Sequence, residues 1–408
     1  MEAAKVIGGL TRMVRDVGLA EDFAQEALVA ALEQWPASGI PANPGAWLML
    51  AAKRRAIDHF RYAERTGLKH EEIGRNLLAL ERATPDFDAA LDDHIGDDVL
   101  RLIFVACHPV LPSEARAALT LRVVAGLTTD EIARAFLVPE PTIAQRIVRA
   151  KRTLAQKRIP FEVPRGLDLE ARLGSVLEVI YLIFNEGYSA TAGQDLVRVS
   201  LCEEALRIGR ILAELAPHEP EVHGLVALME IQASRSRARV ASGGEPVLLL
   251  DQNRAQWDRL LINRGLAALD RADKLSAVKG TYRLQAEIAA CHARALTAEE
   301  TNWGRIVALY NQLAEIAPSP IVDLNRAVAV SRYFGPQAAL DLLDPLLDDP
   351  LMKNYHLLPS VRGDLLSRLG RHAEACAEFE RAASMTRNAR EQALLLDRAR
   401  TSGQQAGS

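Results

Sequence analysis

Basic side chains gather in one segment of a chain that is acidic as a whole. From Arg134 to Arg158 there are seven Lys or Arg residues and one acidic residue, whereas the 408-residue chain carries a net charge of −4. Lysine and arginine neutralise DNA phosphates, and glutamine or arginine can reach base edges in a major groove. The segment is therefore suited to binding nucleic acid. The polar residues that would carry this chemistry are Thr142, Gln145, Arg146, Arg149 and Arg152.

Two helices joined by a tight turn are needed to position these residues. Ser113 is expected to cap a preceding helix that Gly126 ends. Thr128 and Glu131 have the T-x-x-E spacing of a capping box, and a short helix is predicted over 129–136. After a turn at 137–139, a second helix is predicted from about 140 to beyond 154, and the whole is a helix-turn-helix pattern. The alternative is a solvated face in an ordinary helical bundle. The second helix has one apolar stripe, formed by Ile143, Ile147, Ala150 and Leu154.

A second basic segment, Ala46–Tyr62, is predicted to be one helix. Its cations are interleaved with aromatic residues, a combination that suits unstacked DNA, in which bases stack on rings. Trp47 taken alone is more typical of a core residue. The residues expected to face inward are Trp47, Leu50, Ala51 and Ile57, and those expected to face outward are Lys53, Arg55 and Arg61.

A third helix is predicted over Ala20–Trp35, before a loop rich in proline and glycine that runs to Gly45. Phe23, Ala27, Ala31 and Trp35 form its packed stripe. Asp22, Glu26 and Glu33 line another face, and an acidic row of this kind in isolation indicates only a solvated surface.

The composition predicts an all-α fold, because only 5% of residues are aromatic and the apolar residues are mainly Ala, Leu, Val and Ile. Pro85–Asp98 contains six Asp and no Lys or Arg, a pattern typical of a linker. The expected parts are a small domain at 1–65, an acidic linker at 66–98, a helix-turn-helix domain at 99–160, a helical extension at 168–397 and a tail at 398–408.

The extension contains a repeat. Gly335–Leu340 and Gly370–Ala375 align with a shift of 35 residues, and helix–proline–helix units precede them. A period near 34 with small residues at helix crossings is typical of tetratricopeptide repeats, which stack because one unit cannot bury its own apolar face. Val240–Leu250 is the one stretch that reads as a loop or short hairpin.

Several functions are not supported by the sequence. The four cysteines lie 85 to 95 residues apart, so neither a zinc ribbon nor a dithiol site is expected, and Cys107 reads as a small buried residue. No phosphate-binding glycine motif and no nucleophile–base pair occurs, so we expect no enzyme activity, no cofactor and no metal. Neither a signal peptide nor a run long enough to span a bilayer is found, which predicts a cytoplasmic protein.

In order and spacing, the three segments resemble the sigma factors of bacterial RNA polymerase, specifically the extracytoplasmic-function group. Arg15–Ala27 resembles region 2.1–2.2, Ala46–Asp58 resembles regions 2.3–2.4, and Pro112–Arg158 resembles region 4. The remainder is similar to a subgroup with a long tetratricopeptide-like extension. The motifs that carry that similarity are Phe184–Tyr188, Trp257–Arg259 and Pro318–Val328.

The resemblance implies partners and roles. Core RNA polymerase, through the clamp of its largest subunit and its flap region, and promoter DNA are the implied partners. The clamp would meet Asp22, Gln25, Glu26 and Glu33. The loop Ser38–Gly45, including Asn43, would hold a flipped base of the −10 element. The melted −10 strand would meet Lys53, Arg54, Arg55, Asp58, His59 and Arg61. The −35 element would meet Thr142, Gln145, Arg146, Arg149 and Arg152.

The resemblance also implies that Asp86–Asp98 threads the RNA path, and that the extension regulates activity, with a regulatory protein or peptide expected on its repeats. A different class of function stays open at this point, namely a helix-turn-helix regulator with a repeat-based sensor domain, which binds duplex DNA without polymerase. Residues 1–62 separate the two hypotheses, because such a regulator needs neither a clamp-binding nor a strand-melting helix.

Overall fold

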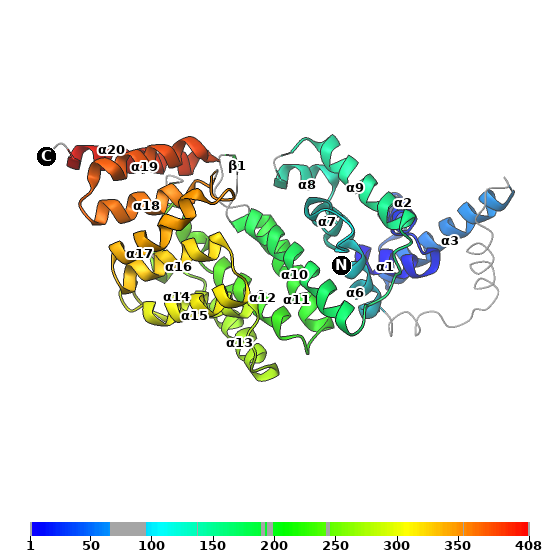
Figure 1. Cartoon of the computed structure of the whole chain (residues 1–408). Helices are drawn as coiled ribbons and strands as arrows, with labels where there is room; N and C mark the ends of the chain where they lie inside the picture. The colour runs from blue at the N-terminus through cyan, green and yellow to red at the C-terminus, as the bar shows by residue number, and fades with distance from the viewer. Residues whose placement is uncertain are drawn as a thin grey trace. The chain divides into compact units, whose positions relative to one another are not determined.

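The structure, a computed structural model, describes residues 2–65, 95–136, 138–188, 192–193, 199–241, 245–353 and 355–406. Apart from one two-residue strand pair, the regular elements of these residues are helices (Figure 1), which confirms the all-α prediction. The chain forms two compact units, a first unit at Met1–Leu182 and a second unit at Ile183–Ser408. Among the described residues, none of the helices has the length and hydropathy of a membrane span.

The helices of the first unit pack in two groups, one around α1 and one around α9. Helix α1 contacts α2, α3 and α6, while α7 and α8 pack on α9. The acidic stretch Asp86–Asp98 lies, up to His94, outside the described residues. The helices of this unit are α1 (Glu2–Val14), α2 (Val17–Ser38), α3 (Pro44–Arg65), α6 (Ile95–Ala106), α7 (Ser113–Thr120), the π-helical turn η1 (Leu121–Ala125), α8 (Thr129–Phe136), α9 (Glu140–Gln156) and the first part of α10 (Leu167–Tyr188).

Three local expectations for the first unit are wrong. Helix α2 continues through Pro36 to Ser38, because a proline in the last turn leaves only the carbonyl of exposed Leu32 without its helical donor, and water can reach it. Leu50 is 49% exposed rather than core, since the inward stripe of α3 runs through Leu48 and Ala52 instead. Ser113 is the first residue of α7 and makes no capping bond.

The second unit is a succession of helices in which each packs on its neighbour in the chain. Gly335 and Gly370, 35 residues apart, both have a positive φ and both lie in the turn before a helix, α17 and α19 respectively. Its helices are the end of α10, α11 (Val199–Leu215), α12 (Pro220–Ala233), η2 (Ser236–Arg239), η3 (Arg254–Gln256), α13 (Arg259–Leu275), α14 (Thr281–Arg294), α15 (Trp303–Ile316), α16 (Pro320–Tyr333), α17 (Pro336–Leu343), η4 (Asp344–Asp348), α18 (Leu357–Arg368), α19 (His372–Met385) and α20 (Ala389–Ala406).

The C-terminal end differs from the predicted tail at 398–408. Helix α20 continues to Ala406, because Ala399 and Ser402 extend the buried stripe that begins at Leu395. Strand β1 (Ala192–Gly193) pairs in parallel with β2 (Arg387–Asn388), so the start and the end of the second unit are joined. The stretch Val240–Leu250 contains an isolated antiparallel bridge between Val240 and Pro246, in line with the expected hairpin.

Candidate nucleic-acid interface

The helix-turn-helix forms as its caps and apolar stripe require. Thr128 Oγ1 accepts from the Glu131 amide at 3.2 Å, and Glu131 Oε2 accepts from the Thr128 amide at 2.7 Å, so both groups of the capping box are satisfied. Pro139 ends the turn and precedes α9. The predicted stripe of α9 is buried, with its four residues between 0% and 6% exposed. One face of α9 is thus fixed and the opposite face is left to solvent.

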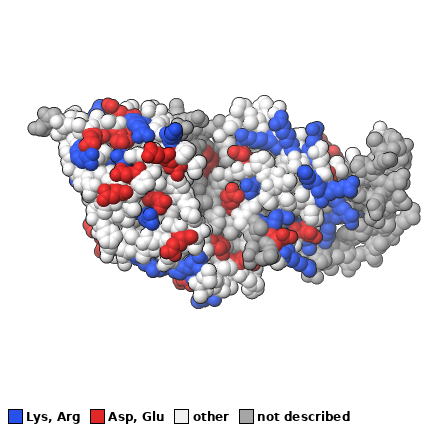
Figure 2. Space-filling view, in the orientation of Figure 1, with Lys and Arg blue, Asp and Glu red and all other residues white. Residues whose placement is uncertain are grey.

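The solvent face of α9 is polar and basic. Gln145, Arg149 and Arg152 are exposed, and Thr142 and Arg146 are partly exposed. None of these three arginines forms an ion pair within the described ranges. Lys and Arg side chains also gather over this part of the first unit in Figure 2. The structure therefore brings all five predicted residues to one helix, with cations available for phosphates.

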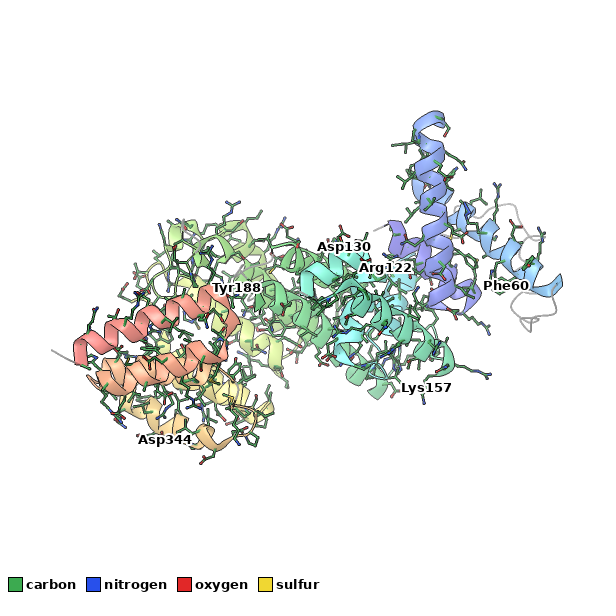
Figure 3. The ribbon with its side chains drawn as sticks, turned by 90° about the horizontal axis from the view of Figure 1, so that it is seen from above. Phe60, Arg122, Asp130, Lys157, Tyr188 and Asp344 are labelled. Carbon is green, nitrogen blue, oxygen red and sulfur yellow. The ribbon has the colours of Figure 1, made fainter. Side chains whose placement is uncertain are left out.

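Helix α3 carries the residues predicted to contact the melted −10 strand. Their surroundings vary more than those of the predicted DNA-binding residues on α9. Arg54 is exposed, whereas Arg55 lies 3.5 Å from Glu26 of α2 and Arg61 lies 3.9 Å from Asp58. His59 is exposed but packs edge-on against Phe23, with ring centres 5.5 Å apart. Lys53 is partly exposed. Phe60, labelled in Figure 3, is buried and serves the core.

The loop before α3 is short and is shaped by Asn43. The Asn43 side-chain oxygen accepts from the Ala46 amide at 3.0 Å, so this residue caps α3. Trp35 and Trp47 pack edge to face at 5.4 Å across the two ends of the loop. Trp47 is half-buried, which fits a residue that packs on the core better than a ring that is open for base stacking.

The acidic row of α2 is largely on the surface. Asp22, Glu26 and Glu33 are exposed, and Gln25 is half-buried. Asp22 lies 3.5 Å from Lys151 of α9, and Glu26 makes the pair with Arg55. Exposed pairs of this kind contribute about 0–1 kcal/mol, so a partner protein can displace them at little cost.

Glu21, one residue before this row, is the functional neighbour that sequence reasoning missed. It is 3% exposed, and it accepts from Arg122 Nε at 2.7 Å and pairs with Lys151. Arg122, labelled in Figure 3, follows α7, so the pair joins α2 to the helix-turn-helix. Because the partners are 101 and 130 positions away, no local pattern could have indicated them.

The first turns of α10 also pack within the first unit, which extends to Leu182. Arg116 of α7 donates to Ser175 and to Glu178, and Ser175 donates to the Cys107 carbonyl at 2.6 Å.

Burial raises the pKa of Cys107 to about 11. The Cys107 thiol is therefore inert, as predicted for a small buried residue. Within the described ranges, no three His, Cys, Asp or Glu residues cluster as metal ligands would.

Comparison with known proteins identifies the family to which this chain belongs. Residues 2–66 match the family model of sigma-70 region 2, and residues 101–154 match that of sigma-70 region 4. An ECF RNA polymerase sigma factor, SigK of Mycobacterium ulcerans, is 33% identical over 155 residues, which cover 37% of this chain and 78% of SigK. The chain belongs to the extracytoplasmic-function (ECF) sigma factors.

Other relatives of this ECF sigma factor cover different parts of it. SigK of Mycobacterium bovis is 31% identical and also spans 37% of this chain and 78% of its own length. An uncharacterized protein of Rhizobium meliloti, R00370, is 45% identical over 393 residues, which cover 96% of this chain and 92% of that protein. Residues 172–273 match a family of unknown function, DUF6596. No solved structure matches the chain. The protein is thus a sigma factor for transcription initiation with a C-terminal helical extension, in a family of non-enzymatic transcription factors.

Proposed function

We propose that this sigma factor binds the polymerase clamp through the acidic row of α2, holds the melted −10 strand with α3 and its preceding loop, and reads the −35 element with α9. The observation that carries the proposal is the solvent face of α9, where unpaired arginines flank a glutamine above a fully buried stripe. Cations at phosphates and polar side chains at base edges are the two contacts that groove recognition requires.

The −10 part of the proposal rests on α3 and the loop before it. Arg54 has no ion pair within the described part of the chain, and His59 presents an exposed ring. Extruding a base costs a few kcal/mol, which stacking and phosphate contacts can offset. Asn43 uses its carbonyl oxygen to cap α3 and keeps its amide group as a donor for a base.

The clamp part is tested by reversing charge on the acidic row. Asp22→Arg with Glu26→Arg should abolish co-purification with core polymerase and run-off transcription, while circular dichroism shows unchanged helix content. Glu114→Arg and Asp270→Arg, at exposed acidic residues outside the row, are the matched controls. Normal co-purification of the double variant would remove α2 as the clamp-binding helix. DNA binding without any polymerase requirement would favour a plain helix-turn-helix regulator instead.

The proposal extends to the helical extension, which we expect to regulate initiation. Residues after Leu182 add a large helical unit that two DNA-binding domains do not need for their own cores. The contacts of Arg116 with Ser175 and Glu178 show that the first part of α10 supports the helix-turn-helix domain. A truncation must therefore separate structural support from regulation.

Two truncations make that separation. A chain ending at Arg165 loses the partners of Arg116, whereas a chain ending at Tyr188 keeps them. We expect both to have altered promoter-specific transcription if the extension regulates. If the chain ending at Tyr188 initiates at the same promoters with the same yield and the same response in cells, the extension has no regulatory role.

A further inference from the structure

A cavity of about 350 Å³ lies inside the second unit, between segments that are distant in the chain. Its walls come from the end of α10, the stretch around η2 and the hairpin at 240–250, the start of α18, and α20. Pro246, Val247, Leu249 and Leu394 supply apolar surface. Pockets for small ligands have volumes of about 300–1,000 Å³ and are mostly apolar with a few polar groups, and this cavity fits that description.

Two arginines in this cavity have no carboxylate partner. Arg235 and Arg239 both line it, and no ion pair to either is found across the described residues. The Nε atoms of both are buried and make no hydrogen bond there. Other arginines of the unit, such as Arg210 and Arg362, are paired with Glu or Asp.

Aromatic rings hold these two guanidinium groups in place. Arg239 lies 3.8 Å from the ring centre of Tyr188, and Arg235 lies 5.9 Å from it and 5.7 Å from that of Trp257. Tyr188 is 8% exposed and is labelled in Figure 3. Cation–π contacts position the two guanidinium groups without using their N–H donors, which remain available for a ligand.

The other charged or titratable side chains of the cavity, Arg398, His356 and Glu391, are already engaged with protein. Arg398 donates to Asp364 and lies over Phe379. His356 Nε2 lies 3.2 Å from Glu391, and Thr386 donates to the same carboxylate at 2.9 Å. The charge of Arg239 also acts on this carboxylate, although the two side chains form no ion pair. Gln252 donates to the Val247 carbonyl, while its own side-chain oxygen is buried and accepts no hydrogen bond. Among the described residues, Arg235 and Arg239 are therefore the charged groups of the cavity that form neither an ion pair nor a hydrogen bond.

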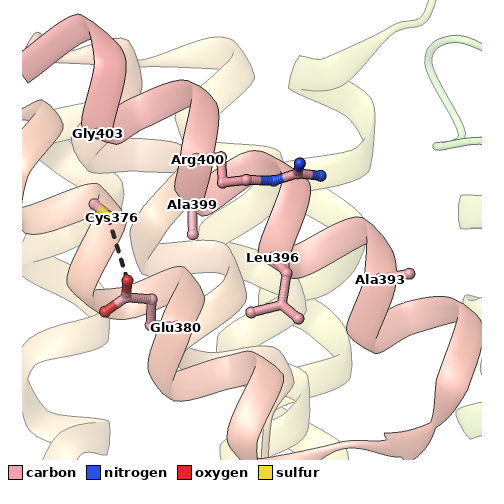
Figure 4. A pocket seen from close by; sticks show the side chains of 7 residues that line it. All are labelled: Cys376, Glu380, Ala393, Leu396, Ala399, Arg400 and Gly403. Carbon is pink, nitrogen blue, oxygen red and sulfur yellow. Dashed lines mark hydrogen bonds between the residues drawn. The ribbon is translucent and has the colours of Figure 1, made fainter.

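A second, larger pocket in this unit does not share these properties. It lies between α19 and α20 and is open to solvent, with Glu380 and Arg400 as its charged groups (Figure 4). Burial and the nearby Glu380 raise the pKa of the Cys376 thiol, so this cysteine is not activated. Nothing in this second pocket calls for an ion.

We propose that the cavity around Arg235 and Arg239, here named the anion cavity, binds a small organic anion, with a carboxylate or phosphate group on the two guanidinium groups and an apolar body against Val247, Leu249 and Leu394. Guanidinium pairs recognise planar or tetrahedral oxyanions by bidentate hydrogen bonds. The proposal deepens the regulatory role proposed above by naming the chemistry of its signal, and it is tested by binding alone, without polymerase.

The test uses two fluorescent probes that differ by one anionic group. Anilinonaphthalene sulfonate has an apolar body and a sulfonate, and phenylnaphthylamine has the same body without it. Full-length protein should bind the sulfonate at least about ten-fold more tightly, because charged hydrogen bonds are worth that much. Arg235→Gln with Arg239→Gln should remove this preference. Arg237→Gln, at an exposed arginine of the same turn, should leave it unchanged.

Two further measurements keep the test decisive. The single variant Arg239→Lys keeps both positive charges, so it should retain much of the preference for the sulfonate. Its near-ultraviolet circular dichroism should be native, which keeps the test valid even if the double variant folds poorly. Competition with octanoate, octyl phosphate and octanol then identifies the group, and displacement by either anion supports the proposal. Equal displacement by octanol, or undiminished sulfonate binding in the double variant, would overturn it.

Discussion

At the scale of single residues, Glu21 matters more to the first unit than the exposed acidic row beside it. A carboxylate that is 3% exposed has lost its hydration, and among the described residues Arg122 and Lys151 compensate for that loss. The exposed pair of Asp22 with the same lysine sacrifices little hydration and contributes little. Of these two neighbouring acidic residues, Glu21 holds α2 to the helix-turn-helix, whereas Asp22 is exposed and available for the clamp contact proposed above.

The first prediction is that Glu21→Gln destabilises the first unit by about 3 kcal/mol, because it leaves two cations facing a neutral group in a buried place. Urea unfolding followed by circular dichroism measures the change in midpoint. Glu33→Gln, on the exposed part of the same helix, should leave the midpoint within experimental error. Equal midpoints for the two variants would show that the Glu21 pairs do not hold α2 to the helix-turn-helix.

His292 gives a prediction about pH. Burial, with the charges of Arg235 and Arg254, lowers its pKa from 6.5 to about 3. Between these values the unfolded chain binds a proton that the folded chain does not, so stability is complete above pH 6.5 and falls as the pH is lowered. In His292→Gln, the slope of unfolding free energy below about pH 6 should decrease by about 1.4 kcal/mol per pH unit. The exposed His218→Gln serves as control, and an unaltered slope in His292→Gln would contradict the assignment.

At the scale of elements, α9 divides its circumference among three tasks. One stripe is buried, one flank sends Lys151 to α2, and the remaining face presents the predicted DNA-binding residues. These tasks do not compete, because the period of the helix places each set on its own side. Single substitutions on the free face therefore report on DNA rather than on folding.

The prediction for α9 separates phosphate contact from base reading. Arg149→Ala should weaken promoter binding by holoenzyme and lower the salt slope by about one, because one phosphate contact is lost. Arg146→Ala should instead relax base preference in the −35 element, at about 1–3 kcal/mol. Promoter titrations at several salt concentrations, with Arg237→Ala as control, measure both effects. Unchanged binding by both variants would mean that the free face of α9 does not meet DNA.

Sequence patterns predicted elements whose causes are local. Thr128 and Glu131 predict the start of α8, and the spacing of the apolar residues from Ile143 to Leu154 predicts the buried stripe of α9. Where the outcome depended on tertiary neighbours, the patterns failed. Helix α20 runs on to Ala406 because Ala399 and Ser402 are buried against neighbouring elements. The burial of Glu21 could not be inferred, because its partners come from distant segments. The cavity around Tyr188 could not be inferred either, because its walls come from distant segments.

At the scale of the whole molecule, the two units have separate cores and should unfold as separate cooperative transitions. We predict two transitions in calorimetry of the full chain. Glu21→Gln should lower the midpoint of one only, and His292→Gln should alter the pH dependence of the other only. A single transition that both variants shift equally would show that the units unfold together.

The parallel pairing of β1 with β2 has a consequence for the order in which the second unit assembles. Neighbouring helices can associate early, because the chain between them is short. Joining Gly193 to Asn388 closes a ring of about 195 residues, and the entropy of that closure is of the order of 5 kcal/mol. The closure should therefore be the last step of folding and the first to be lost. Tyr188 and Glu391 flank this junction, so an anion bound in the cavity that they line would stabilise the pairing of β1 with β2 and keep the ring closed.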